Sequence, residues 1–304
     1  MYLFNAQING QKDWGRMFQS IPAFTPLVEY IFAKEKLRFS PAQNLTPGTN
    51  AVFKVGEYVV KIFAPKESGF DQVLDLETEL FAARRANALN ISAPKVIADG
   101  MVEDRYNFAY MITEYIEGAE FTEAVKTMSG AEKTAFGRRL RDIADRMNTP
   151  CEPFNGIDVI NDISRYRRWD QYPEQFRKER LAYIKSQDFG ESVFVHGDLC
   201  EDNILLTPRG EIYIIDFADA VLAPAIYEHS LVAFVFNLDP ALLKGYFGSI
   251  SNAAFVELLF NGLLIHDFGG DIVKDNIGKP SEFNTLHELR DRLKEVIICA
   301  IHGK

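Results

Sequence analysis

Residues 194–217 decide the fold. They read FVHGDLCEDNILL (194–206), then the polar turn TPRG (207–210), then EIYIIDF (211–217). Three polar side chains, Asp198, Asn203 and Asp216, stand at the edges of apolar runs, where short strands can hold them rigidly. Turn chemistry explains any one of them, because Asp and Asn side chains bond nearby backbone groups. It explains the set less well, because charged groups in buried strands are costly unless they are paired or metal-bound.

A carboxylate, an amide and a second carboxylate are the groups that phosphoryl transfer from a nucleotide requires. One orients and deprotonates an attacking hydroxyl, and the other two hold Mg²⁺ over the phosphates. The stretch therefore predicts a site for nucleotide-dependent phosphoryl transfer.

Composition excludes several other classes of protein. The chain has 304 residues, of which 47% are hydrophobic and 25% charged, which suits one large domain or two lobes. Its net charge of −10 argues against nucleic acid as a partner, because such binding needs clustered Lys and Arg. The N-terminus lacks the features of a signal peptide, and no apolar run approaches about 18 residues. Cys151, Cys200 and Cys299 have no metal-ligand spacing. We expect a cytoplasmic protein without membrane contact.

The order of predicted elements indicates an α+β protein with two lobes, residues 1–117 and 118–304. In the first lobe, two β-rich runs flank the turn Gly56-Glu57 and predict a β-hairpin. The helical period of residues 73–89 predicts one long helix, and further strands are expected at 94–98 and 108–113. Residues 24–38 read as a helix within an additional N-terminal segment, 1–44, to which the sequence assigns no role. The second lobe is predicted to be mostly helical, with a capping box at Ser129 and Glu132.

Lys61 ends a Val-Val-Lys-Ile strand, so packing holds its stem while its ammonium extends past the sheet. A Lys in this position pairs with the α- and β-phosphates of a nucleotide and is aligned by a Glu on the following helix, for which Glu77 and Glu79 are candidates. Backbone N–H groups of Gly48, Thr49 and Asn50 could approach the phosphates. A surface lysine at a strand edge is the alternative for Lys61 alone, but the order of hairpin, lysine, helix and Asp loop favours the nucleotide site.

These motifs resemble the aminoglycoside phosphotransferase and choline kinase family, which shares the bilobal protein-kinase fold. The resemblance extends from about residue 45 to 235 and is carried by Val60-Lys61-Ile62, Glu79, Ile112–Gly118, Val195–Leu199, Asn203–Leu205 and Ile215-Asp216-Phe217. It implies a small N-terminal antiparallel sheet with one long helix and a larger, mostly helical C-terminal lobe.

The resemblance also implies the role of each residue toward ATP or GTP and Mg²⁺. Asp198 would be the catalytic base, Asn203 and Asp216 the Mg²⁺ ligands, and Lys61 the phosphate contact, with Glu79 as its helix partner. The remaining nucleotide contacts would be the backbone of Glu114 and Ile116 on the adenine edge, and the side chains of Phe53 and Ile62, with Ile215 as a third candidate, around the ring.

The phosphate acceptor is expected to be a hydroxyl of a cationic small molecule, first an aminoglycoside or related amino-sugar. Residues 119–304 carry 21 basic and 29 acidic groups, a net charge of −8, which would attract a cation. Choline or another amino alcohol, homoserine and a sugar remain alternatives, as does a non-catalytic nucleotide-binding interaction protein. Two further features stay open. The aromatic residues Tyr166, Trp169 and Tyr172 form either a wall for a cationic substrate or part of the helix packing. The acids Asp267 and Asp271 are either substrate contacts, as the resemblance implies, or turn residues. The family's Tyr-Asp-Leu is replaced by Tyr227-Glu228-His229. The sequence does not indicate the oligomeric state.

Overall fold

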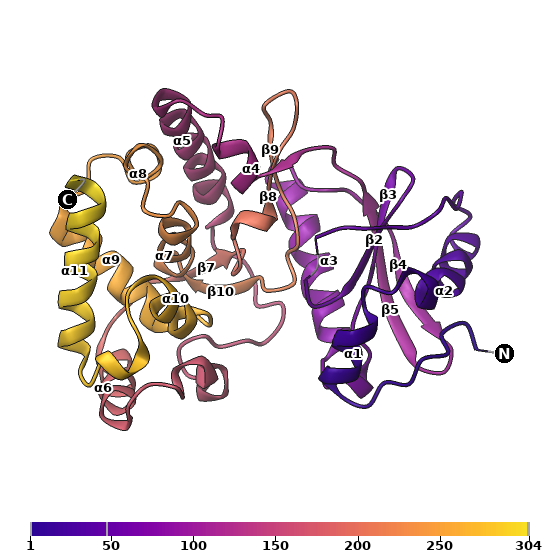
Figure 1. The fold of residues 1–304 in the computed structure, drawn as a ribbon, viewed down its shortest axis with the longest axis horizontal. Helices are drawn as coiled ribbons and strands as arrows, with labels where there is room; N and C mark the ends of the chain where they lie inside the picture. The colour runs from indigo at the N-terminus through magenta and orange to yellow at the C-terminus, as the bar shows by residue number, and fades with distance from the viewer. Residues whose placement is uncertain (1, 47, 303–304) are drawn as a thin grey trace. The chain divides into compact units, whose positions relative to one another are not determined.

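The computed structural model describes residues 2–46 and 48–302, and its internal contacts divide the chain into two units (Figure 1). The sheet unit comprises residues 1–118 and 205–219, and the helical unit comprises 119–204 and 220–304. The sequence places 205–219 with the C-terminal lobe, whereas the internal contacts group this segment with the sheet unit. The segment forms the hairpin of β8 (Ile204–Leu206) and β9 (Ile212–Ile214), and the N–H of Ile214 donates to the carbonyl of Ser92 at 2.9 Å.

A five-stranded antiparallel sheet forms the centre of the sheet unit. Its order is β1-β2-β3-β5-β4, with β1 (Gln43–Asn44), β2 (Ala51–Val55), β3 (Tyr58–Ile62), β4 (Val96–Glu103) and β5 (Asn107–Glu114). The predicted hairpin is confirmed, because β2 and β3 pair from Ala51 opposite Ile62 to Val55 opposite Tyr58. Gly56 in its turn has a φ of 65°, a left-handed conformation that glycine adopts without steric cost.

The two faces of this sheet are covered by different helices. The long helix α3 (Gln72–Ala88) packs on one face, over Phe63, Ala109 and Met111. On the other face, α1 (Gln11–Met17) and α2 (Ile21–Lys34) build a larger core rich in aromatic rings. The rings or side chains buried there include Phe4, Trp14, Phe24, Phe53, Val60, Ile62 and Phe108. The additional N-terminal segment is therefore one layer of the sheet unit.

Helices dominate the other unit, as the sequence predicts. They are α4 (Phe121–Val125), α5 (Gly130–Met147), α6 (Glu174–Ser186), α7 (Ile226–Val235), α8 (Pro240–Phe247), α9 (Asn252–Ile265), α10 (Gly269–Asn276) and α11 (Leu286–His302). The strand β6 (Ala119–Glu120) begins the unit, and β7 (Ser192–Val195) pairs with β10 (Val221–Pro224) in antiparallel fashion. Four 3₁₀ turns complete the described elements of the chain: Lys66–Ser68, Ile163–Trp169, Glu201–Asn203 and Pro280–Glu282.

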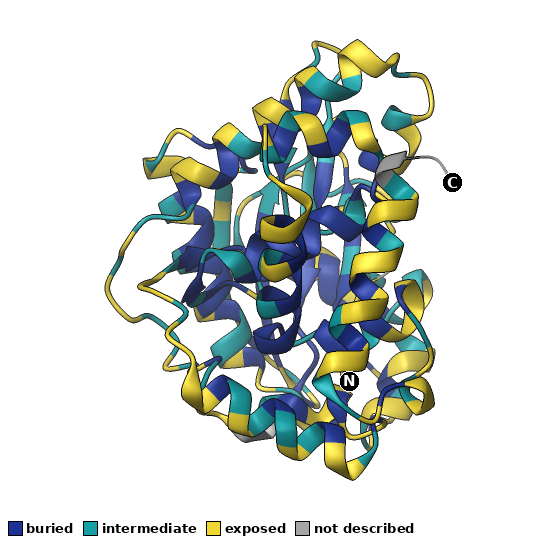
Figure 2. Cartoon of the chain, turned by 90° about the vertical axis from the view of Figure 1, so that its left-hand side faces the viewer, coloured by how far each residue is buried: buried dark blue, intermediate teal, exposed yellow. Residues whose placement is uncertain are grey.

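Sequence signals account for local details of the helical unit. The predicted capping box starts α5. The Ser129 side chain accepts the N–H of Glu132, and the Glu132 carboxylate accepts the backbone N–H of Ser129. The helices α5 and α8 approach closely because Gly137 on α5 lies against α8 and Gly245 on α8 lies against α5. A Cβ at Gly245 would lie 2.2 Å from the carbonyl of Thr134, so no larger residue fits. Buried residues gather in the interior, and exposed ones line the outer sides of the helices (Figure 2).

No single helix within 2–46 and 48–302 is long and apolar enough to cross a membrane. In the part of the chain that the structure describes, one pair of helices, α8 and α9, reaches that length and hydropathy together, and the pair is bent by 84° at its junction.

Candidate active site

Lys61, Glu79 and Asp216 form one ion-paired cluster in the sheet unit. Lys61 on β3 places its Nζ 2.7 Å from an oxygen of Glu79 on α3 and 2.7 Å from an oxygen of Asp216, which follows β9. Lys61 and Glu79 are buried, whereas the Asp216 side chain is 42% exposed. Of the two candidates Glu77 and Glu79, the resemblance implied Glu79; in the structure Glu79 pairs with Lys61, and Glu77 is exposed. Residues 155 positions apart thus present a cation and a half-exposed carboxylate side by side.

Burial and charge act in opposite directions on the pKa of Lys61. Burial alone would lower it, but the carboxylates of Asp216 and Glu79 more than offset that effect and hold the pKa above its ordinary value. Burial raises the pKa of Glu79 to about 7, although the nearby Lys61 ammonium lowers it in part. The Lys61 side chain is therefore a fixed positive charge at neutral pH, held by two counter-ions.

Asp216 has a φ of 58°, in the left-handed region. Asp tolerates this conformation better than most residues, because its short side chain can bond to the local backbone. Non-glycine residues held in this region cluster at functional sites. The turn directs the Asp216 carboxylate to Lys61 immediately after β9 ends.

The predicted catalytic loop lies in the helical unit, directly after β7. Asn203 donates from its Nδ2 to the backbone carbonyl of Asp198 at 2.8 Å and to the Asp198 carboxylate at 3.2 Å. His196 is fully buried, and its Nδ1 accepts the N–H of Asp198 at 3.2 Å. The buried His196 ring therefore holds the backbone of the loop next to Asp198. Burial raises the pKa of the Cys200 thiol to about 12, which disfavours the reactive thiolate.

Glu228 lies beneath this loop and is fully buried at the start of α7. One carboxylate oxygen accepts the N–H of Gly197 at 3.1 Å, and the other has no hydrogen-bond partner among the described residues. Burial raises the pKa of Glu228 to about 8, although the backbone N–H groups of Gly197 and His196 lower it in part. The glutamate that replaces the family's aspartate therefore supports the backbone next to Asp198.

The chemistry of Asn203 and Asp216 fits Mg²⁺. Because the Asn203 Nδ2 donates to Asp198, its amide oxygen is the atom available to a cation. Amide and carboxylate oxygens are ligands that Mg²⁺ accepts, usually as one or two protein groups supplemented by phosphate oxygens and water. No cluster of three or more Asp, Glu, His or Cys side chains arranged to hold a metal occurs in the described part of the chain.

The predicted ring contacts Phe53 and Ile62 are corrected by the strand register. Both are fully buried in the core beneath α1 and α2, on the face of the sheet opposite to Lys61. Side chains alternate along a strand, so Val59 shares the face of Lys61, and Val52 pairs directly with Lys61 across the hairpin. Val52 and Val59 are both half-buried. The sequence alone allows this assignment, because the position of Lys61 defines which alternate residues of the strand share its face of the sheet.

The other predicted nucleotide contacts lie at or beyond the ends of β2 and β5. Gly48, Thr49 and Asn50 lead into β2; Gly48 and Thr49 are exposed, whereas Asn50 is buried and its side-chain oxygen accepts the N–H of Ala64 at 3.0 Å. Glu114 ends β5, and its backbone N–H already donates to the carbonyl of Lys95. Ile116 is half-buried two residues beyond the strand.

The aromatic group Tyr166, Trp169 and Tyr172 is a packing feature. All three side chains are buried. The cation that contacts two of these rings belongs to the chain itself: the guanidinium of Arg180 lies 4.0 Å from the ring centre of Tyr166 and 4.6 Å from that of Trp169. Of the two alternatives that the sequence left open, helix packing is therefore the one that the structure supports.

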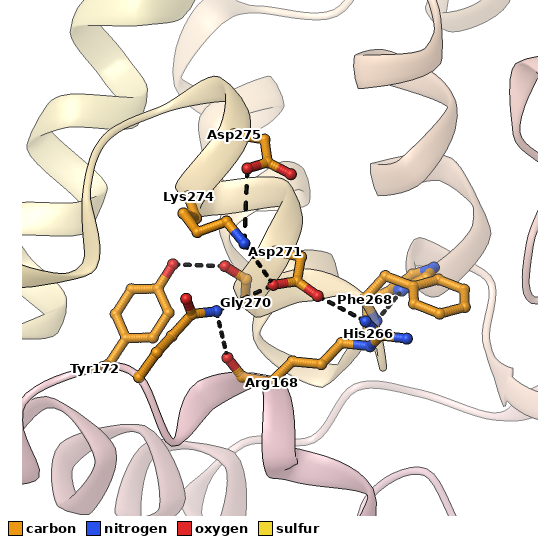
Figure 3. Close-up of polar contacts among 9 residues, drawn as sticks. Arg168, Tyr172, His266, Phe268, Gly270, Asp271, Lys274 and Asp275 are labelled. Atoms are coloured by element: carbon orange, nitrogen blue, oxygen red, sulfur yellow. Dashed lines mark hydrogen bonds and ion pairs between the residues drawn. The ribbon is translucent and has the colours of Figure 1, made fainter. Parts of the chain in front are cut away.

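The acids Asp267 and Asp271 are similarly neutralised by residues of the helical unit. Asp267 forms an ion pair with Arg165. Asp271 pairs with Arg168 at 2.6 Å and with Lys274 at 3.1 Å (Figure 3). These contacts lower the pKa of Asp271 even though burial alone would raise it. Each carboxylate already has a counter-ion within the chain, so neither is left unpaired to bind a cationic substrate.

Comparison with known proteins gives a consistent assignment. Residues 48–256 match the phosphotransferase enzyme family, APH. The chain is 26% identical over 110 residues to Aurora kinase B of Danio rerio, a match that covers 36% of this chain and only 33% of that relative. The chain thus spans about a third of the length of the curated relative that it matches.

Solved structures with the same fold cover nearly the whole chain. A GDP complex of a mutant aminoglycoside 2′-phosphotransferase-IIIa has a TM-score of 0.61 at 15% identity, with 93% of this chain and 96% of that chain covered. The streptomycin–ATP complex of APH(2″)-IIa gives 0.56 at 18% identity, covering 89% and 97%. Choline kinase LicA from Streptococcus pneumoniae gives 0.55 at 16% identity, covering 91% and 99%. The chain therefore belongs to the phosphotransferase enzyme family and has the kinase-like fold that its sequence predicts.

Proposed function

We propose that this chain transfers the γ-phosphoryl group of ATP or GTP to a hydroxyl of a small molecule, with Mg²⁺. The observation that carries the proposal is the cluster of Lys61, Glu79 and Asp216, in which a buried, fully charged lysine is held beside a half-exposed carboxylate. Such a lysine supplies fixed positive charge to phosphate oxygens without reorganisation during the reaction.

The nucleotide contacts follow from the Lys61 face of the sheet. Lys61 binds α- and β-phosphate oxygens, and backbone N–H groups of Gly48–Asn50 bind the phosphates from the loop before β2. Val52 and Val59, the half-buried residues on that face, enclose the base. The backbone carbonyl of Glu114 and the backbone of Ile116 are the proposed hydrogen-bonding groups for its edge.

Asp198 is the proposed catalytic base, and it orients the acceptor hydroxyl and takes its proton. Asn203 restrains Asp198 through both of its hydrogen bonds, and Glu228 supports the backbone of the loop. Positioning of this kind provides most of the rate in phosphoryl transfer. Asn203 and Asp216 would hold Mg²⁺, which supplies charge neutralisation to the phosphate oxygens when bound.

The nucleotide class is supported by relatives of the same fold. Their structures are described as complexes with GDP, with ATP and with ADP. We therefore propose a purine nucleoside triphosphate as donor, without a choice between ATP and GTP. None of the three cysteines forms a disulfide, which supports action in a reducing cytoplasm.

An aminoglycoside or related amino-sugar is the first acceptor class to test. Several structures of similar fold are aminoglycoside phosphotransferases, one described with streptomycin and one with kanamycin. A singly charged amino alcohol is the second candidate. The pairing of Asp267 and Asp271 with arginines favours it, because fewer unpaired carboxylates remain for a polycation, and choline kinase LicA has a similar fold.

The test is a phosphotransfer screen with ATP and GTP against amino-sugars, amino alcohols, homoserine, neutral sugars and a peptide. Wild-type protein is compared with Asp198→Asn, which keeps the size of the side chain and removes the base. A product formed by wild type and lost in Asp198→Asn supports the proposal. Nucleotide binding without transfer to any acceptor class would favour a non-catalytic interaction protein, and equal turnover by both proteins would remove Asp198 from its role.

A further inference from the structure

The N-terminal segment, to which the sequence assigned no role, contacts the loop that precedes β2. Trp14 on α1 is 2% exposed, and its indole Nε1–H donates to the carbonyl of Thr49 at 2.8 Å. These residues are 35 positions apart in the chain. The contact therefore joins the added N-terminal layer to the backbone that the proposed function assigns to the nucleotide phosphates.

Packing fixes the position of the indole ring. Its centre lies 5.9 Å from that of Phe24 in an edge-to-face arrangement and 6.3 Å from that of Phe18. Phe24 in turn contacts Phe53 of β2, with ring centres 5.5 Å apart. At its start, α1 is tied to the sheet unit where the N–H of Gly10 donates to the carbonyl of Glu67 at 2.8 Å. Trp14 is thus a rigid donor, since its ring cannot turn away without disturbing this core.

The direction of this hydrogen bond controls the neighbouring amide. The carbonyl of Thr49 and the N–H of Asn50 belong to one planar peptide unit, and in a trans peptide they point in opposite directions. Holding the carbonyl toward Trp14 therefore directs the N–H of Asn50 away from α1. The Asn50 side chain restrains the same residue by accepting the N–H of Ala64.

We propose that Trp14 is a positioning residue for the phosphate-binding backbone of Gly48–Asn50, so that the N-terminal segment sets the affinity for nucleotide phosphates. The inference rests on the proposed function, because it takes this loop as the phosphate contact. The N-terminal layer then has a role beyond covering the sheet: it orients the Thr49–Asn50 peptide before the nucleotide arrives.

The test removes the N–H and keeps the ring. In one protein, Trp14 is replaced by 3-benzothienylalanine, in which sulfur stands in place of the indole N–H. In a second, it is changed to phenylalanine, Trp14→Phe. Phe4→Leu is the matched control, because Phe4 is a fully buried ring of the same core that contacts Phe24 and Phe108. Calorimetry measures the Kd of each protein for ATP and for adenosine, and thermal melting reports stability.

Loss of this hydrogen bond is expected to raise the Kd for ATP about fivefold, the effect of one ordinary hydrogen bond, and to leave the Kd for adenosine unchanged. Phe4→Leu should melt at a lower temperature with both Kd values unchanged. The inference is overturned if the benzothienyl protein binds ATP as wild type does, or if the affinities for ATP and adenosine fall together. Wild type that binds neither compound would instead refute the proposed function.

Discussion

Lys61 and Arg180 are both buried cations, but their surroundings differ in kind. Lys61 has two carboxylates at 2.7 Å, and one of them, Asp216, is half-exposed. Arg180 lies against the rings of Tyr166 and Trp169 and donates to the backbone carbonyl of Leu264. Burial lowers the pKa of Arg180 to about 9, whereas the carboxylates keep that of Lys61 above its ordinary value.

The difference separates a functional charge from a structural one. A cation beside a partly exposed acid can exchange partners with phosphate oxygens and a metal ion. A cation enclosed by rings and a backbone carbonyl stabilises the packing and is not accessible to a ligand. Burial and charge alone therefore do not identify a site; the exposure of the counter-ion does. If this is correct, changes at Lys61 should affect catalysis and changes at Arg180 should affect stability.

Lys61→Met is expected to have the largest effect, about a 10³-fold loss of phosphotransfer, because it removes fixed charge from the phosphates. Methionine keeps the length and much of the volume of the stem. The melting temperature should change little, because Glu79 can become protonated when its counter-ion is lost. The rate of product formation with saturating acceptor is the measurement. Transfer within tenfold of wild type would show that Lys61 is structural, as Arg180 is.

Arg180→Ala should lower the free energy of unfolding by roughly 3 kcal/mol, through the cavity it leaves and the loss of its contacts with two rings. The turnover of the folded fraction should match that of wild type. Urea denaturation gives the stability, and Arg177→Ala provides the control, because Arg177 lies on the same helix with an exposed ion pair of small energetic weight. A normal stability with impaired turnover would reverse the comparison.

Glu228 extends the comparison to a buried acid, and its pKa of about 8 predicts a pH dependence. The unfolded chain has a Glu pKa near 4.3, so the folded state binds more protons between that value and about 8. The stabilising contribution is complete below about pH 4.3 and is lost as the pH rises to about 8. The slope from this group is at most about 1.4 kcal/mol per pH unit.

The variant Glu228→Gln cannot titrate, so its unfolding free energy should vary less with pH across this window. Glu123→Gln changes an exposed glutamate of the same unit and should follow the wild-type curve. Denaturant unfolding at several pH values makes the measurement. A wild-type slope retained in Glu228→Gln would show that Glu228 is ionised throughout.

Several parts of the site could be predicted because their chemistry depends on local order. The Asp198 loop follows a strand, Asp216 follows another, and Lys61 precedes a helix with Glu79 on its buried side. In each case the position of the residue at a strand end or on a helix face follows from the neighbouring sequence. The fold class followed from the same order of elements, and the family match and the fold comparison confirm it.

Other parts depend on contacts between distant segments. Phe53 was placed on the nucleotide because its covering layer, α1 and α2, had no assigned position, although strand alternation would have indicated Val52 and Val59. The bond from Trp14 to Thr49 ends on a backbone carbonyl, which leaves no signal in the sequence. The partner of Arg180 is a pair of rings from a 3₁₀ turn, and only packing brings them together.

The central claim, that Asp216 beside Lys61 serves nucleotide and metal, is tested most directly by calorimetry of ATP binding with and without Mg²⁺. Wild type should bind ATP more tightly when Mg²⁺ is present, by about tenfold or more. Asp216→Ala should bind ATP with one weak affinity that Mg²⁺ does not change. An Asp216→Ala protein that retains the wild-type response to Mg²⁺ would contradict the account.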